Sequence, residues 1–147
     1  IGAGCSEASI TAAQVVEGSR VPMISPTSAS PELSDGNKFP YFLRTSVSSV
    51  FTATSMVDVL SKLWNYTGIA LVHSADTFGI GAASTFADEA RGSGLEVIVA
   101  ASFPRGESDF SAICSMLHHS QLRVIVLYCY AEDASRFMRT ALELGIG

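Results

Sequence analysis

Apolar residues recur along most of the chain in blocks that alternate between helical spacing and short continuous runs. Continuous apolar runs predict strands, and apolar side chains three or four positions apart predict amphipathic helices. The predicted helices span residues 53–64, 83–90, 110–117 and 134–141, and the predicted strands span 69–72, 97–101 and 124–127. This alternation predicts an α/β fold with a doubly wound parallel sheet. Because Val124–Leu127 is rich in β-branched residues, we expect that strand to be buried on both faces.

The first 50 residues predict a smaller set of elements. Ser6–Glu17 reads as a helix that Gly18 ends, and strands follow at 21–24 and 40–45. Two or three strands and one helix cannot close a core, and Ile1 looks like the end of a strand, so we expect a piece of something larger. The polar connector at 45–49 is the expected boundary, which divides the chain into residues 1–47 and 48–147.

A row of hydroxyl side chains follows the strand at 21–24. Pro26 and Pro31 end that strand and place the hydroxyls on a loop at its carboxyl end; they are Ser25, Thr27, Ser28 and Ser30. In open α/β sheets small ligands bind at this end of the strands, and compact hydroxyl groups suit a carboxylate. An ordinary Ser/Pro turn explains the same residues equally well.

Polar or aromatic residues also follow the other predicted strands. They are Ser6, the segment 74–78 with Phe78 at its end, and the segment 130–132, which begins with Tyr130. If the two parts of the chain face each other, these strand ends line one cleft. The alternative is that they are ordinary polar strand ends.

Composition excludes several classes of protein. The chain is 48% hydrophobic and 16% charged, with a net charge of −5 and no cluster of basic residues, which argues against a nucleic-acid-binding groove. Its three cysteines are too few for a disulfide scaffold. Asn65-Tyr66-Thr67 is an acceptor sequence for N-linked glycosylation at Asn65, and it favours a secreted chain.

The sequence contains no complete motif for catalysis, metal binding or nucleotide binding. Two glycine pairs, at 2–4 and 79–81, imitate a dinucleotide fingerprint, but Glu7 and Ser84 occupy the place of the third glycine. Cys114 could pair with a histidine one helical turn later, but no second pair of metal ligands accompanies them. We therefore expect no enzyme activity, no metal and no cofactor.

Four segments together resemble one family of proteins. They are IGAGCSEAS, VPMISPTSASPELSD, FPYFLRT and LWNYTGIALVH, in this order. They resemble the ligand-binding receptor family, which comprises the extracellular clamshell domains of class C G-protein-coupled receptors, those of natriuretic-peptide receptor cyclases, and related bacterial amino-acid-binding proteins. The first three segments are closest to metabotropic GABA and glutamate receptors. The end of the chain, LRVIVLYCY and RFMRTALELGI, is also similar to the natriuretic group.

The resemblance implies a type I periplasmic-binding-protein fold, in which two doubly wound lobes hold the ligand between them. Residues 1–47 then end the first half of lobe 1, and 48–147 form the first half of lobe 2. Ser6 matches a serine at a helix N-terminus that holds the ligand carboxylate. Ser28, with Thr27 beside it, matches the second hydroxyl contact on the same lobe, and Tyr130 matches the lobe 2 tyrosine that packs on the ligand in GABA receptors.

Two positions depart from the glutamate receptors of this family. Ser49 stands where they have an acid that binds the ligand amine, and Phe78 replaces a stacking tyrosine. The resemblance still implies a receptor ectodomain on the extracellular side of the membrane, which closes around a small amino-acid-like or carboxylate ligand. It would dimerise through lobe 1, with itself or a relative, and signal through the rest of a membrane receptor. The alternatives are a soluble binding protein of a transport system and an α/β enzyme.

Overall fold

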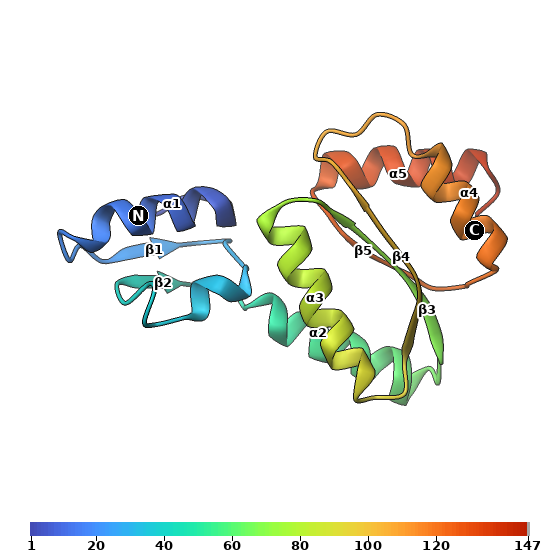
Figure 1. Ribbon diagram of the computed structural model, residues 1–147, viewed down its shortest axis with the longest axis horizontal. Coiled ribbons are helices and arrows are strands. Elements are labelled where there is room, and N and C mark those ends of the chain that lie inside the picture. Colours follow the sequence, from blue (N-terminus) through green and yellow to red (C-terminus); the bar gives the residue numbers. More distant parts are fainter. Residues whose placement is uncertain (147) are drawn as a thin grey trace.

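The computed structural model describes residues 1–146, which form two separate parallel sheets joined by a short connector (Figure 1). The N-terminal part contains α1 (Ser6–Glu17), β1 (Met23–Ser25), the 3-10 turn η1 (Pro31–Ser34) and β2 (Phe42–Arg44). Strands β1 and β2 pair in parallel, with Met23 opposite Phe42. Apolar side chains of α1 pack against both strands and η1 in a small core centred on Met23, Leu33 and Phe39.

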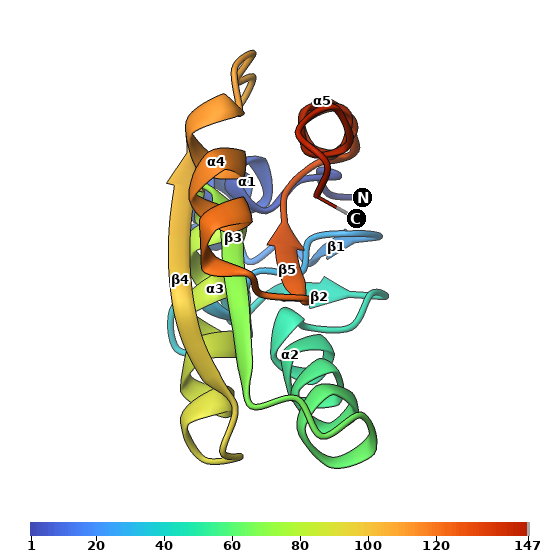
Figure 2. The same cartoon turned by 90° about the vertical axis from the view of Figure 1, so that its right-hand side faces the viewer.

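The C-terminal part is a three-layer α/β unit. Its elements are α2 (Ser49–Asp58), the π-helical turn η2 (Val59–Leu63), β3 (Gly68–Ser74), α3 (Thr77–Arg91), β4 (Glu96–Phe103), α4 (Ser111–Ser120), β5 (Ile125–Tyr128) and α5 (Ala131–Glu143). The strands are parallel in the order β4-β3-β5 (Figure 2). Helices α2 and α3 cover one face and α4 and α5 the other, which confirms the predicted doubly wound α/β class.

This strand order creates a switch point between β3 and β5. Helix α3 follows β3 on one face of the sheet, whereas α5 follows β5 on the other face. Both helices therefore begin at the same edge of the sheet but diverge, which is where open α/β sheets form ligand-binding crevices. On the α5 side, three buried aromatic rings pack edge to face, with Phe110 between Phe103 and Phe137 at centroid distances of 4.9 and 5.7 Å.

The predicted elements are present, with three instructive differences. The expected connector at 45–49 is shorter, because the Ser48 hydroxyl caps α2 and the helix already begins at Ser49. Helix α3 begins at Thr77, earlier than predicted, because Asp76 caps it by accepting a hydrogen bond from the Gly79 N–H at 2.7 Å. The prediction that Val124–Leu127 is buried on both faces was wrong: β5 is an edge strand of this sheet, and Ile125 and Leu127 are half-buried. The fully covered strand is β3, which lies between β4 and β5.

Gly79 lies where α3 packs closely against the end of β3, so a substitution there tests this packing. A Cβ atom at Gly79 would lie 2.1 Å from the Ser74 carbonyl oxygen, so Gly79→Ala must push α3 away from the sheet. We expect a loss of at least about 2 kcal/mol in the free energy of unfolding, because overpacking usually costs about 1–3 kcal/mol. Chemical denaturation of the purified protein measures this loss.

Gly92 provides the matched control at the other end of the same helix. A Cβ atom there would meet only the Glu89 carbonyl oxygen, at 3.8 Å, and its φ of −82° suits alanine. Gly92→Ala should therefore leave stability unchanged or raise it slightly. Equal effects of the two substitutions would contradict the close approach of α3 to β3.

Candidate functional site

The hydroxyl loop lies against the beginning of α1. Ser25 donates its hydroxyl proton to the Ala3 carbonyl oxygen at 2.7 Å, and the Ser28 N–H donates to the Ser25 hydroxyl oxygen at 3.0 Å. The hydroxyl groups of Ser28 and Ser9 are 2.8 Å apart. These buried contacts fix the loop from 25 to 30 on α1, so several of its hydroxyls have the structural role that an ordinary Ser/Pro turn would give them.

Ser6 and Thr27 are placed differently within this region. Ser6 is 3% exposed, and its hydroxyl oxygen accepts a hydrogen bond from the Ser30 N–H at 3.2 Å. That contact leaves the Ser6 hydroxyl proton free to be donated to another acceptor. Thr27 is exposed and donates its hydroxyl proton to the Gly4 carbonyl oxygen. The structure thus gathers Ser6, Thr27 and Ser28 around the N-terminus of α1, although Ser28 is 1% exposed and faces α1.

The N-terminus of α1 lacks a side-chain cap. Its N-cap residue is Cys5, which makes no capping hydrogen bond. The N–H groups in the first turn of a helix have no partner within the helix, and they give that end a partial positive charge. The start of α1 therefore offers free N–H groups to an anion, beside the Glu7 carboxylate of the same first turn.

Phe78 and Tyr130 meet at the switch point of the larger sheet. Phe78 lies in the first turn of α3 and Tyr130 is the N-cap residue of α5; their ring centroids are 5.7 Å apart, with the planes tilted by 54°. Both side chains are half-buried. The structure therefore brings together the two aromatic residues that the sequence placed at separate strand ends.

Arg105 is a residue of this site that the sequence analysis missed. Its guanidinium carbon lies 4.2 Å from the centroid of the Tyr130 ring, within the range of a cation–π contact. Burial and then Asp76 raise the pKa of the Tyr130 hydroxyl, and Arg105 opposes them by lowering it. Arg105 comes two residues after the end of β4, so the rule that drew attention to the other strand ends could have identified it.

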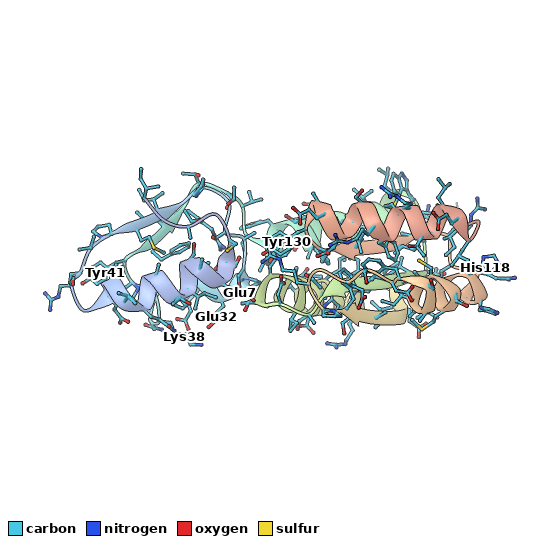
Figure 3. All side chains as sticks on the ribbon, turned by 90° about the horizontal axis from the view of Figure 1, so that it is seen from above. Glu7, Glu32, Lys38, Tyr41, His118 and Tyr130 are labelled. Carbon is cyan, nitrogen blue, oxygen red and sulfur yellow. The ribbon has the colours of Figure 1, made fainter. Side chains whose placement is uncertain are left out.

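The two parts of the chain touch through the beginnings of α1 and α3. Glu7 accepts a hydrogen bond from the Thr77 N–H at 3.3 Å and another from the Thr77 hydroxyl at 3.5 Å. Figure 3 places Glu7 and Tyr130 on either side of this junction. The Glu7 carboxylate is a smaller cause of the raised pKa of Tyr130, after burial and Asp76, so the phenol lies within electrostatic reach of the first turn of α1.

A cavity of about 610 Å³ lies beside this contact. Its charged lining residues are Glu7 and Glu32 from the N-terminal part and Asp76 from the C-terminal part, and all three are acidic. None of the five residues expected to bind ligand lines this cavity, but it adjoins two of them, because Glu7 follows Ser6 and Thr77 precedes Phe78.

Two buried polar atoms near the junction have no hydrogen-bond partner among residues 1–146. They are the hydroxyl oxygen of Ser49, which is 4% exposed, and Oδ2 of Asp76, which is 8% exposed. The Ser49 N–H donates to the Ala29 carbonyl oxygen at 2.9 Å, so α2 begins directly against the hydroxyl loop. A buried polar group without a partner is costly to stability and is often found at a functional site.

The remaining reactive groups favour structural roles. Burial, with smaller contributions from Asp133 and Asp76, raises the pKa of the Cys129 thiol to about 11, and burial also raises the pKa of Cys114. Protonated thiols are poor nucleophiles. Within residues 1–146, no three His, Cys, Asp or Glu side chains converge to hold a metal ion, and no helix combines the length and apolar character needed to span a membrane.

Comparison with known proteins identifies one family that matches the whole chain. A family model described as "Receptor family ligand binding region" matches residues 1–147. Metabotropic glutamate receptor 4 of Macaca fascicularis is 30% identical over 147 residues, which cover 96% of this chain and 16% of that receptor. The metabotropic glutamate receptor of Drosophila melanogaster is 31% identical over 144 residues, covering 96% of this chain and 15% of that receptor.

A probable metabotropic glutamate receptor of Caenorhabditis elegans is 30% identical over 158 aligned positions, covering all of this chain and 16% of that receptor. The chain thus spans about one sixth of the length of these relatives, all of which are receptors and not enzymes. The match over the whole chain, together with parallel sheets covered by helices, shows that the chain belongs to the family of receptor ligand-binding regions with the type I periplasmic-binding-like fold.

Proposed function

We propose that the chain is part of the two-lobed extracellular ligand-binding domain of a cell-surface receptor, with residues 1–47 in the first lobe and 48–147 in the second. The domain closes around a small amino-acid-like or carboxylate ligand and signals through the rest of a membrane receptor. It forms a homodimer or a heterodimer through the first lobe. The names of the relatives, which are glutamate receptors, support an amino-acid-like ligand.

The observation that carries this proposal is the meeting of two features at one junction. On one side is the α1 N-terminus, which has no side-chain cap and carries the Ser6 hydroxyl. On the other side is the aromatic pair of Phe78 and Tyr130. A carboxylate at the helix N-terminus gains hydrogen bonds from free N–H groups, while the aromatic pair covers the apolar stem of the ligand.

In the closed state the start of α3 lies against the start of α1. Glu7 and Thr77 connect the first turns of these helices in the structure, and closure keeps this contact. A ligand shifts the domain towards closure only as far as it binds the closed state more tightly than the open one. A ligand held by Ser6 on one lobe and Tyr130 on the other meets this condition, because only the closed state provides both contacts.

Ser6→Ala tests the carboxylate contact. It removes one hydroxyl donor to a charged group, which is worth about 1.5–3 kcal/mol, so L-glutamate and other carboxylates of a test panel should bind about ten- to a hundred-fold more weakly. Titration of the full-length receptor with the panel measures this affinity.

Ser9→Ala is the matched control for Ser6→Ala. Ser9 is completely buried three residues along the same helix and bonds to Ser28, so its loss loosens the hydroxyl loop without removing the proposed ligand donor. Ser9→Ala should lower the melting temperature and, through the loosened loop, weaken binding of the panel slightly, by much less than Ser6→Ala does. Equal affinities of the wild type and Ser6→Ala would contradict the proposed site.

We also propose that Asn65 carries an N-linked glycan. Asn65 and Thr67 are exposed, and Asn65 adopts a left-handed conformation with a φ of 56° in the turn after α2 and η2. An exposed turn makes the side-chain amide accessible to a glycosyltransferase. After expression in eukaryotic secretory cells, peptide N-glycosidase should increase the gel mobility of a tryptic peptide that contains Asn65.

Asn65→Gln and Thr67→Ala should abolish this mobility change, whereas Thr67→Ser, which keeps the acceptor sequence, should retain it. A peptide from the wild type with the mass of unmodified asparagine at position 65 would rule out the modification.

A further inference from the structure

The loop between β4 and α4 places a free cation on the aromatic pair of the candidate site. Arg105 lies in this loop, is exposed, and stacks on the Tyr130 ring at 4.2 Å. Within residues 1–146, no carboxylate lies within salt-bridge distance of its guanidinium group. A guanidinium group has five N–H donors, and a cation–π contact through its flat face leaves them available at its edge.

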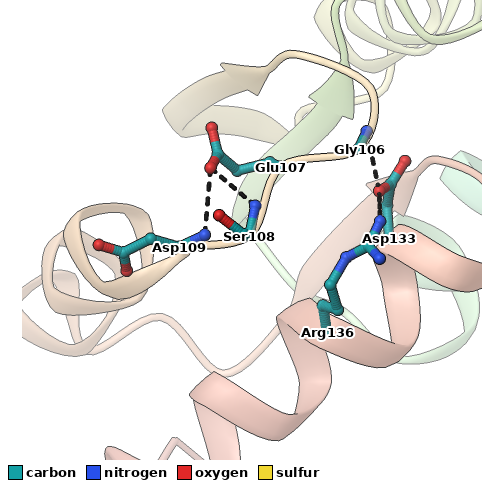
Figure 4. Close-up of polar contacts among 6 residues, drawn as sticks. All are labelled: Gly106, Glu107, Ser108, Asp109, Asp133 and Arg136. Atoms are coloured by element: carbon teal, nitrogen blue, oxygen red, sulfur yellow. Dashed lines mark hydrogen bonds and ion pairs between the residues drawn. The ribbon is translucent and has the colours of Figure 1, made fainter.

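The loop is held in place by a buried acid on α5. Asp133 is 2% exposed, and its Oδ1 atom accepts a hydrogen bond from the Gly106 N–H at 3.1 Å and another from a guanidinium nitrogen of Arg136 at 2.6 Å (Figure 4). Gly106 has a φ of +83°, a conformation that glycine adopts without strain. Since Arg105 directly precedes Gly106, this contact fixes the position from which Arg105 reaches Tyr130.

The same loop is stiffened on its other side. Glu107 accepts hydrogen bonds from the Ser108 N–H at 2.8 Å and the Asp109 N–H at 3.1 Å (Figure 4). The Asp109 carboxylate in turn accepts a hydrogen bond from the Ser111 N–H at 2.9 Å, at the start of α4. The segment that carries Arg105 is therefore anchored at both ends by its own polar contacts.

We propose that Arg105 is the residue of the second lobe that binds an anionic group of the ligand, and that Asp133 is the positioning residue that holds Arg105 there. This inference rests on the proposed function, because it requires that the ligand lie next to Tyr130. Asp133 acts only through the loop and makes no ligand contact itself.

The surroundings of Arg105 favour an anion. Arg105, Tyr130 and Arg136 line a pocket of about 360 Å³ at the beginning of α5, where the helix has no side-chain cap and carries partial positive charge. Asp133, which also lines it, is already paired with Arg136. Glu132 lines the same pocket, but it is exposed and outside salt-bridge distance of Arg105. A planar guanidinium group binds a carboxylate through two parallel hydrogen bonds, and such contacts are stronger than those of neutral groups.

Arg105 also changes the role expected of Tyr130. Because the guanidinium group covers one face of the ring and Phe78 contacts the ring as well, Tyr130 serves as a platform for Arg105 as much as a surface for the ligand. The positive charge of Arg105 lowers the pKa of the Tyr130 hydroxyl, as expected of two side chains in contact.

Two probes that differ in one charged group test the proposal in the full-length receptor. L-Glutamate and L-glutamine are nearly equal in size, and only L-glutamate has a second carboxylate. We expect the wild type to prefer L-glutamate, and Arg105→Ala to reduce this preference at least about ten-fold while leaving the affinity for L-glutamine nearly unchanged. Arg105→Lys keeps the charge but not the paired hydrogen bonds, so it should retain part of the preference.

Arg123→Ala is the matched control, since it removes an exposed arginine at the opposite end of β5 and should leave the preference unchanged. Asp133→Ala should reduce the preference as Arg105→Ala does. Asp133→Asn should retain most of it, because its side-chain oxygen can still accept the Gly106 N–H. This rescue separates positioning from general loss of stability.

The outcomes distinguish this inference from the proposed function. An unchanged preference in Arg105→Ala, or equal weakening of both probes, overturns the role of Arg105, even if Ser6→Ala shows that the cleft binds carboxylates. If neither probe binds the wild type, the proposed ligand class fails, and the role of Arg105 fails with it. A preference that Asp133→Ala leaves intact overturns the positioning role of Asp133.

Discussion

The parallel pairing of β3 with both β4 and β5 is the constraint on which the candidate site depends. Parallel strands end at the same edge of a sheet, so the segments that follow β3, β4 and β5 meet there. Phe78, Arg105 and Tyr130 come from these three segments, and the Tyr130 ring contacts the other two side chains. Helices α3 and α5 leave that edge on opposite faces of the sheet, and the first turn of α3 contacts the N-terminal part of the chain through Thr77 and Glu7.

The N-terminal part offers hydrogen-bond donors at the start of α1. Its serine hydroxyls are mostly used to hold the loop from 25 to 30 on α1, which leaves the start of α1 rigid and without a side-chain cap. A rigid helix N-terminus binds an anion without first ordering its donors, and this lowers the entropic cost of binding. The same network explains why serines of this loop that were expected to contact a ligand are buried: their hydroxyls hold the loop in place.

Local patterns predicted the elements well, because helical spacing and apolar runs report directly on one buried face. They failed for β5, since an apolar β-branched run does not reveal whether a strand lies at the edge or the centre of its sheet. Ser6, Phe78 and Tyr130 could be found from strand ends and the family resemblance. Contacts between distant residues, such as Asp133 with Gly106, 27 positions apart, leave no periodic signal in the sequence. The contact of Arg105 with Tyr130 is also between distant residues: the end of β4 could have drawn attention to Arg105, but not to its partner.

We propose that a small carboxylate binds between the α1 N-terminus and the aromatic pair at the switch point. An experimental structure of the full-length ectodomain with L-glutamate tests it most directly. We expect a ligand carboxylate within hydrogen-bond distance of the Ser6 N–H and hydroxyl, with Tyr130 and Arg105 on the other side of the ligand. A ligand bound away from α1, or one bound in the acidic cavity beside Glu32 without contact to Ser6, would contradict it.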